Sequence, residues 1–390
     1  MNQREKIKEL LTRGVEEVID RPHLERSLRS GKKLRVKLGI DPTSPNIHIG
    51  RAVLLLKLRA FQDLGHKAVF IVGDFTALVG DTSDKDSERP MLIEAQVKVN
   101  MVNYFQQAYK ILDKKKTEVH FNSEWLKKLG FIEIANMAKL FGLHEFESRE
   151  IISKRMKVGK RVSFHELMYP LMQGYDSVAV KADVELGGTD QKFNLLSGRK
   201  VQKAYGQSPQ DIMTMQILEG TDGRKMSSSW GNVINITDSP ENVFGKVMSI
   251  PDSLIEKYFL LATRLPQPEI QGIIKKNSPR DQKIILAEEI TKQYHGANTA
   301  RLAKNRFIHQ VVKKELPINI PSKKIKNGNY KLSELLSLTG LVSSKSAARR
   351  VIAQRGVKVN NVVVDKDVSI EKASRGILLR VGKRKFLKIM

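Results

Sequence analysis

Apolar residues follow two different spacings in the first part of the chain, and together they predict alternating helices and strands. An amphipathic helix is predicted over residues 3–19 from the helical spacing of Ile7, Leu10, Leu11, Val15 and Val18. Apolar runs over 36–40 and 68–72 predict strands, with a buried helix over 52–64 between them. A strand, a helix and a parallel strand form one right-handed crossover, which predicts the start of a Rossmann-like, nucleotide-binding α/β layer.

The same patterns divide the rest of the chain. The later elements of the α/β layer are predicted as a long helix over 91–112, a strand over 118–121, a helix over 164–176 and strands over 183–186 and 213–218. Residues 240–311 have a helical pattern throughout, with prolines that mark starts and breaks. The predicted organisation is an α/β domain over 1–235, an α-helical domain over 236–312, a linker over 313–329 and a small basic α+β domain over 330–390.

Composition and charge narrow the function. The 390 residues are 41% apolar, contain no cysteine and carry a formal net charge of +26. We expect no membrane span and no signal peptide, because no long apolar run occurs and the first residues are polar. The absence of cysteine excludes disulfides and thiolate zinc sites and fits the cytoplasm. The charge predicts a polyanionic partner, although a generally basic proteome would also produce it. The terminal domain, with fourteen basic and four acidic residues, suits contacts with folded RNA.

Two polar loops carry the candidate chemistry. The stretch VKLGIDPTSPNIHIGR, over 36–51, places Thr43, His48 and Gly50 where a strand ends and a helix begins. A helix N-terminus offers free N–H groups and partial positive charge, which suits a nucleoside triphosphate. An ordinary turn would fit this loop equally well if it stood alone. The second loop, GRKMSSS over 223–229, adds Lys225 as a point charge for phosphates and three hydroxyl groups.

A third stretch, YPLMQGYD, predicts a binding face. Tyr169, Gln173 and Asp176 are spaced by four and three residues, so they project from one face of a largely buried helix. Buried polar groups need partners, and a bound polar ligand would supply them. Further along, the glycine-rich turn that ends in Asp190 and Gln191 permits close approach of a ribose or base.

The two loops resemble the signatures of class I aminoacyl-tRNA synthetases, which are conventionally written HIGH and KMSKS. They stand here as His48-Ile49-Gly50-Arg51 and Lys225-Met226-Ser227-Ser228-Ser229. The binding face resembles that of the bacterial tyrosyl-tRNA synthetases, and the sequence looks closest to the subgroup with a KLG-type first strand. The terminal domain resembles the RNA-binding domain found at the C-terminus of that family. The resemblance covers essentially the whole chain.

The resemblance implies an enzyme that forms tyrosyl-adenylate from tyrosine and ATP with Mg²⁺, and then transfers tyrosine to the 3′ end of tRNA(Tyr). It also implies a cytoplasmic homodimer without a prosthetic group and without metal ligands. The implied catalytic residues are Thr43, His48 and Lys225. The implied ATP-binding residues are Gly50, Arg51, Gly188, Asp190, Lys225, Ser227 and Ser228. The implied tyrosine-binding residues are Lys37, Asp81, Asn122, Tyr169, Gln173, Asp176 and Gln191. The implied tRNA-binding residues are Lys345, Arg349 and Arg350.

Three positions depart from the family pattern. Arg51 replaces the second histidine of the first signature, Ser228 replaces a lysine of the second, and Lys37 stands where many bacterial members have a tyrosine near the substrate phenol. Arg51 and Ser228 both stand in the proposed ATP site, so a weakened ATP site stays an open alternative. The alternative hypotheses are therefore a catalytically impaired paralogue that binds structured RNA and, disfavoured by the binding face, the sister tryptophan enzyme.

Overall fold

The computed structural model describes residues 2–82, 91–309, 320–372, 376–382 and 385–390, so 313–319 of the predicted linker lie outside the described residues. The chain forms two compact units, Met1–Lys304 and Asn305–Met390, and each is described by itself. Among the helices of these described ranges, none has the length and apolar character needed to cross a membrane.

A six-stranded sheet organises the first unit, as the Rossmann-like prediction requires. Its order is β1-β6-β5-β2-β3-β4, and all neighbours pair in parallel except β1 with β6. The strands are β1 Val15–Ile19, β2 Arg35–Ile40, β3 Lys67–Val72, β4 Thr117–Phe121, β5 Val184–Gly188 and β6 Asp211–Met215. Because β2 lies between β3 and β5, the strand order reverses beside it, and such a switch point predicts a ligand crevice at the carboxyl ends.

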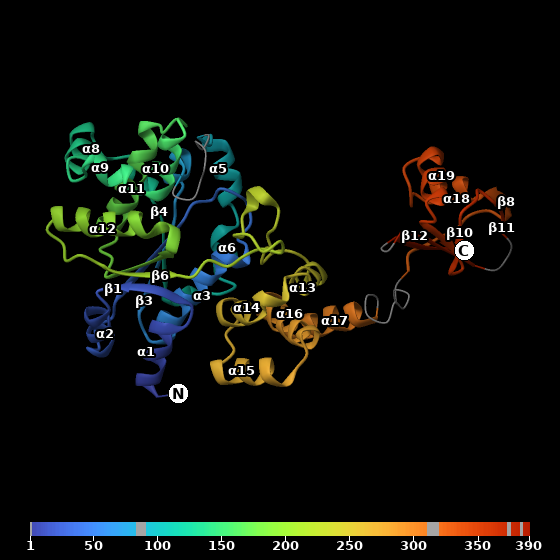
Figure 1. The fold of residues 1–390 in the computed structure, drawn as a ribbon, viewed down its shortest axis with the longest axis horizontal. Coiled ribbons are helices and arrows are strands. Elements are labelled where there is room, and N and C mark those ends of the chain that lie inside the picture. The colour runs from blue at the N-terminus through green and yellow to red at the C-terminus, as the bar shows by residue number, and fades with distance from the viewer. Residues whose placement is uncertain (1, 83–90, 310–319, 373–375, 383–384) are drawn as a thin grey trace. The chain divides into compact units, whose positions relative to one another are not determined.

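Helices cover this sheet, and in Figure 1 the strands cross the middle of the unit with α11 and α12 above them and α1 and α2 below. The helices up to β6 are α1 Gln3–Thr12, α2 Arg21–Arg29, α3 Ile49–Asp63, α4 Thr76–Val79, α5 Glu94–Met101, α6 Tyr104–Ala108, α7 Ser123–Leu126, α8 Phe131–Ala138, α9 Leu143–Glu147, α10 Glu150–Lys157, α11 Phe164–Ala179 and α12 Lys192–Ala204. The predicted helical region is confirmed as α13 Pro240–Met248, α14 Ile255–Ala262, α15 Gln267–Lys276, α16 Pro279–His295 and α17 Ala297–Phe307.

The single helix predicted over 3–19 is wrong in its second half. The helix ends at Thr12, and Gly14 adopts φ +63°, a left-handed conformation that favours glycine. A Cβ atom on Gly14 would also lie 2.3 Å from Leu261 Cδ2. The β-branched residues that follow pair with β6, and the helical spacing of Val15 and Val18 was a coincidence of a five-residue strand.

The long helix predicted over 91–112 is also interrupted, between α5 and α6. The interruption turns Gln107 towards the first polar loop, where its side chain accepts from the Ile47 amide at 2.8 Å and donates to the Pro45 carbonyl at 2.8 Å. Sequence periodicity carries no signal for such contacts between distant segments.

The second unit is a small α+β fold, as predicted. Its strands are β7 Ser322–Lys323, β8 Gly328–Lys331, β9 Val357–Val359, β10 Val362–Val364, β11 Ser369–Lys372, β12 Ile377–Val381 and β13 Lys385–Ile389, and its helices are α18 Leu332–Leu338 and α19 Lys345–Ala353. The five-stranded sheet has the order β10-β9-β12-β13-β7, and β11 pairs with β8. Strands β7 and β8 begin inside the segment predicted as a linker, where two- and four-residue strands give no visible periodicity.

Two cations, the buried Lys57 and the half-buried Arg13, tie the N-terminal helix to its neighbours in the first unit. Lys57 on α3 donates to the carbonyls of Leu10 and Arg13, both at 2.8 Å, at the C-terminal end of α1. Arg13 in turn donates to the carbonyls of Leu260 and Thr263, at 2.9 and 2.8 Å, at the end of α14. Each cation therefore satisfies carbonyl groups that a helix end leaves unpaired. Burial lowers the pKa of Lys57 to about 7.

We expect Lys57→Met to change how the free energy of unfolding depends on pH. Between about pH 7 and pH 10 the unfolded wild type keeps a proton on Lys57 that the native state has lost, so its stability rises with pH in that window. The difference between wild type and variant, measured by urea unfolding from pH 6 to 10, should follow this rise. Parallel curves for the two proteins would contradict the assignment.

Candidate active site

A cavity of about 280 Å³ lies at the carboxyl ends of the parallel strands, where the strand order predicts it. Strand β2 pairs with β5 at only two positions, and beyond them the residues of both strand ends line the cavity. The predicted residues that line it are Thr43, His48, Gly50, Arg51, Asp81, Asn122, Tyr169, Gln173, Asp176, Gly188, Asp190, Gln191, Lys225, Ser227 and Ser228. The fold thus brings together, from six separate segments, every residue predicted for this site except Lys37.

The two polar loops touch each other at Gly50. Its amide donates to the Met226 sulfur at 3.3 Å, and a Cβ atom there would lie 3.1 Å from His48 Nδ1. His48 caps α3, and its Nδ1 accepts from the Arg51 amide at 3.3 Å. Burial, and then the positive charges of Arg51 and Lys225, lower the pKa of His48 to about 3. The imidazole is therefore neutral at pH 7, and with Nδ1 accepting, its proton is on Nε2 as a donor.

Arg51 is held by other side chains of the site. Its guanidinium donates to the Tyr104 hydroxyl at 2.6 Å and to Thr43 Oγ1 at 2.8 Å. The departure from the family signature therefore connects α3 to α6 and fixes the Thr43 hydroxyl. Tyr104, which is fully buried, had no sequence signal beyond an apolar position in the long predicted helix.

Asp41 is a functional candidate that the sequence treated only as part of a turn. Its carboxylate accepts from the Tyr169 hydroxyl at 2.9 Å and from Thr76 Oγ1 at 2.8 Å. A Cβ atom on Gly73 would lie 2.1 Å from Asp41 Oδ1, so glycine is required there for space. The position of Asp41 at the end of β2, directly before a proline, was the available signal.

Asp176 is a buried carboxylate with two uncharged N–H donors. It accepts from Trp125 Nε1 at 2.7 Å and from Asn122 Nδ2 at 3.2 Å. Burial raises the pKa of Asp176 to about 7, although the positive charge of Lys37 and both hydrogen bonds act in the opposite direction. The sequence predicted Asn122 but not Trp125. This group can accept one more hydrogen bond from a ligand hydroxyl.

Lys37 does not line the cavity, contrary to its predicted place among the tyrosine-binding residues. Its side chain is fully buried and lies against Glu185 Oε1 at 2.9 Å, the Gln173 carbonyl at 2.9 Å and Ser177 Oγ at 2.8 Å. These three acceptors satisfy all three ammonium protons. We therefore correct its role from ligand contact to support of the cavity wall.

Four further predicted residues form two pairs. Gln191 Nε2 donates to Asp81 Oδ2 at 2.6 Å. Lys225 Nζ lies 2.9 Å from Asp190 Oδ2, and both side chains are partly exposed. Ser228 Oγ lies 3.3 Å from Ser44 Oγ, so the second loop reaches the first there as well. The cavity thus has one end rich in cationic and N–H donors, which suits a polyanion, and one end rich in buried acceptors.

The residues predicted to bind RNA lie together on α19 in the second unit. Lys345 pairs with Glu334 at 2.8 Å, Arg349 lies 3.5 Å from Asp367, and Arg350 is exposed. The three cations therefore share one helix, and their contact with RNA stays a prediction.

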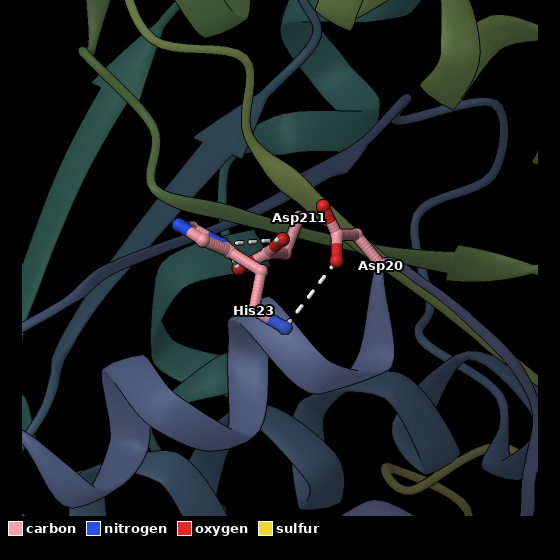
Figure 2. Close-up of side chains that lie close together, drawn as sticks. All are labelled: Asp20, His23 and Asp211. Atoms are coloured by element: carbon pink, nitrogen blue, oxygen red, sulfur yellow. Dashed lines mark hydrogen bonds and ion pairs between the residues drawn. The ribbon is translucent and has the colours of Figure 1, made fainter.

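A second polar group lies at the opposite edge of the main sheet, shown in Figure 2, and consists of Asp20, His23 and Asp211. His23 Nδ1 lies 3.0 Å from both carboxylate oxygens of Asp211, and Asp20 caps α2 by accepting from the His23 amide. Among the described residues this is the one group of His, Asp and Glu side chains with the spacing for a metal ion. A contact between an imidazole and a carboxylate, together with a helix cap, accounts for the geometry of this group, and none of its three residues lines the cavity.

Comparison with known proteins gives two family matches and many full-length relatives. A model described as tRNA synthetases class I (W and Y) matches residues 29–311, and one described as S4 domain matches residues 331–367. A tyrosine–tRNA ligase of Thermotoga maritima is 46% identical over 396 residues, covering 100% of this chain and 98% of that protein. One from Carboxydothermus hydrogenoformans is 46% identical over 401 residues, covering 98% and 97%.

Solved structures agree in fold. A tyrosyl-tRNA synthetase from Archaeoglobus fulgidus, complexed with L-tyrosine, gives a TM-score of 0.62 at 22% identity and covers 78% of this chain and 100% of that chain. A C-terminally truncated mitochondrial tyrosyl-tRNA synthetase from Aspergillus nidulans gives 0.65 at 23% identity and covers 77% and 92%.

We expect Asp176→Asn to remove a pH dependence of stability. The native carboxyl keeps its proton up to about pH 7, whereas the unfolded chain loses it near 3.8. The contribution of Asp176 to the free energy of unfolding is therefore fully present below pH 3.8 and is lost as the pH rises through 7. Unfolding of wild type and variant should be compared from pH 4 to 8, with Asp252→Asn, at a largely exposed aspartate, as the matched control. A constant difference between wild type and Asp176→Asn would contradict a raised pKa.

Proposed function

We propose roles for the cavity residues on the premise that this chain belongs to the class I tRNA synthetases and, within them, to the bacterial tyrosine–tRNA ligases. It is a tyrosine–tRNA ligase, which uses ATP to activate tyrosine before the transfer to tRNA. The observation that carries the assignment of the substrate to this cavity is the polar face of α11, with Tyr169, Gln173 and Asp176 on its wall.

The end of the cavity that is rich in acceptors is the proposed tyrosine site. Asp176, fixed by Asn122 and Trp125, accepts the hydrogen of the substrate phenol. Tyr169, Gln173 and Asp81 face the substrate ammonium group, with Gln191 beside its carboxylate. Phenylalanine would leave a buried acceptor without a partner, and tyrosyl-tRNA synthetases are a well-known example of discrimination by this effect.

The cationic end is the proposed site for MgATP, which enters as a substrate. The substrate carboxylate attacks the α-phosphate, a bond forms between them, and pyrophosphate leaves. A carboxylate is already a nucleophile, so catalysis depends on position and on charge stabilisation. We assign the contacts with the leaving phosphates to Thr43, neutral His48 and Lys225, and those with the ribose to Asp190 beside Gly188. Gly50 gives the base room, and Ser227 and Ser228 complete the closing loop.

The structure favours an indirect role for Arg51, because both of its described hydrogen bonds fix neighbouring side chains. It orients the Thr43 hydroxyl and adds positive charge near His48. Arg51, in place of the second histidine of the signature, can therefore support the phosphate site through Thr43 and His48.

The second unit is the proposed tRNA contact, since an S4 domain model matches it and Lys345, Arg349 and Arg350 share α19. We also propose a homodimer in the cytoplasm, where tyrosine, ATP and tRNA(Tyr) meet. The support for a dimer is a set of large apolar side chains that the first unit leaves exposed, Val99, Val102, Phe131, Ile132 and Phe164. Large apolar side chains such as these would be removed from water where two copies of the chain meet.

Exchange of labelled pyrophosphate into ATP tests this function without tRNA. We expect exchange with tyrosine and none above background with tryptophan or phenylalanine. Asp176→Asn should narrow the preference for tyrosine over phenylalanine, because the charged acceptor is gone. Failure of the folded wild type to exchange with any of the three amino acids, while it still binds tRNA, would instead support the impaired RNA-binding paralogue.

Charge reversal on α19 tests the second unit. Arg349→Glu with Arg350→Glu should lower charging of tRNA and reduce the dependence of log K on log salt by about one to two, because phosphate contacts are lost. Tyrosine-dependent pyrophosphate exchange should stay unchanged. Lys6→Glu with Lys8→Glu, at exposed positions of α1, makes the same change in net charge and is the control. Equal charging by the α19 variant and the control would remove the RNA role of this helix.

A further inference from the structure

A buried ion pair lies directly behind the proposed tyrosine site. The side chains of Lys37 and Glu185 are 0% and 1% exposed, and Lys37 Nζ lies 2.9 Å from Glu185 Oε1. The two residues are register partners, and they are the last paired position of β2 and β5 before the cavity begins. Buried ion pairs are often no more stabilising than apolar residues of the same volume. Stability alone therefore does not explain this pair.

The pair holds one turn of α11 from two sides. Lys37 donates to the Gln173 carbonyl at 2.9 Å and to Ser177 Oγ at 2.8 Å. Glu185 accepts from Gln173 Nε2 at 3.1 Å, from Ser177 Oγ at 3.1 Å and from Gln210. Both the backbone and the side chain of Gln173 are thus fixed, and so is the turn of helix that carries Asp176.

The pair also acts on the charge of Asp176. The titratable groups near the Asp176 carboxylate are Lys37 on β2, Glu185 on β5 and Tyr169 on α11. Asn122 and Trp125 are its uncharged donors. Lys37 favours the ionised carboxylate and Glu185 opposes it. The two members of one ion pair therefore act on the tyrosine acceptor in opposite directions.

We propose that Lys37 and Glu185 determine specificity for tyrosine as a supporting pair in the cavity wall, by fixing the Gln173 to Ser177 turn and by setting the electrostatic balance at Asp176. This inference rests on the proposed tyrosine site. Lys37 and Glu185 are then positioning residues, and their charges have opposite effects on the ionisation of Asp176.

The test is the pH profile of kcat/KM for tyrosine in pyrophosphate exchange, which reports the ionisation of groups in the free enzyme. Lys37→Met should move the acidic limb to higher pH. If the pKa of Asp176 rises by about one unit from about 7, kcat/KM should be about fivefold lower at pH 7, because the ionised fraction falls from about one half to about one tenth. Glu185→Gln should move the same limb to lower pH. The KM for ATP should stay unchanged in both variants, because the ATP end of the cavity does not contact the pair.

Several controls separate this idea from loss of folding and from failure of the proposed function. Glu185→Gln is nearly isosteric, and the double variant Lys37→Met/Glu185→Gln, whose limb should lie between those of the single variants, removes both charges. Glu166 is on α11, as Asp176 is, but it does not line the cavity, and it forms a buried ion pair with Arg155 on α10. Glu166→Gln disturbs that pair and should leave the pH profile unchanged. Limbs that move in the same direction, or do not move, in the two single variants would overturn the inference. Absence of tyrosine-dependent exchange in the wild type would overturn the proposed function instead.

Discussion

The site depends on the short stretch over which β2 pairs with β5. Six residues of β2 pair with β3, but only Val36 and Lys37 pair with β5, at Val184 and Glu185. Beyond these positions the two strands supply cavity walls instead of a continuous ladder. The parallel crossover from β2 through α3 also places the N-terminus of α3, with His48 as its cap, at this opening. One topological feature therefore supplies both the crevice and its anion-binding end.

Burial of carboxylates in such a crevice is costly, and the structure offsets the cost with dedicated partners. Asp41 has Thr76 and Tyr169, Asp176 has Asn122 and Trp125, and Glu185 has Lys37. Glu185 is offered a full opposite charge in contact, the ammonium group of Lys37. Asp176 instead has neutral donors, so its pKa rises on burial to about 7, which leaves the carboxyl group responsive to small changes in its surroundings.

The sequence predicted the cavity residues well where a side chain points from a regular element or a loop next to it. Tyr169, Gln173 and Asp176 follow helical spacing, and the two signature loops are local strings of residues. It failed where the partner is distant in sequence. Nothing local distinguishes Trp125 or Tyr104 from core aromatic residues, and Lys37 was assigned to the ligand although its ammonium is occupied by Glu185 and α11. The same reason explains β1, whose edge pairing with β6 overrides a helical spacing of two valines.

The two ends of the cavity differ in how closely their side chains, without a ligand, already have the arrangement that the substrate needs. At the tyrosine end Asp176 already bonds to Trp125 and Asn122, and Tyr169 bonds to Asp41, so these groups need little reorganisation when a substrate arrives. Asp81 and Gln191 are bonded to each other and must separate to reach the substrate. At the ATP end Lys225 lies on Asp190, and both are assigned to the nucleotide. A polyphosphate and a ribose must therefore take these two groups from each other. Because both side chains are partly exposed, water can solvate each of them while the pair separates, and the exchange costs less than it would for a buried pair. The acceptor for the substrate phenol is therefore preformed, whereas the groups proposed for the amino acid's charged end and for the nucleotide must first leave their partners within the protein.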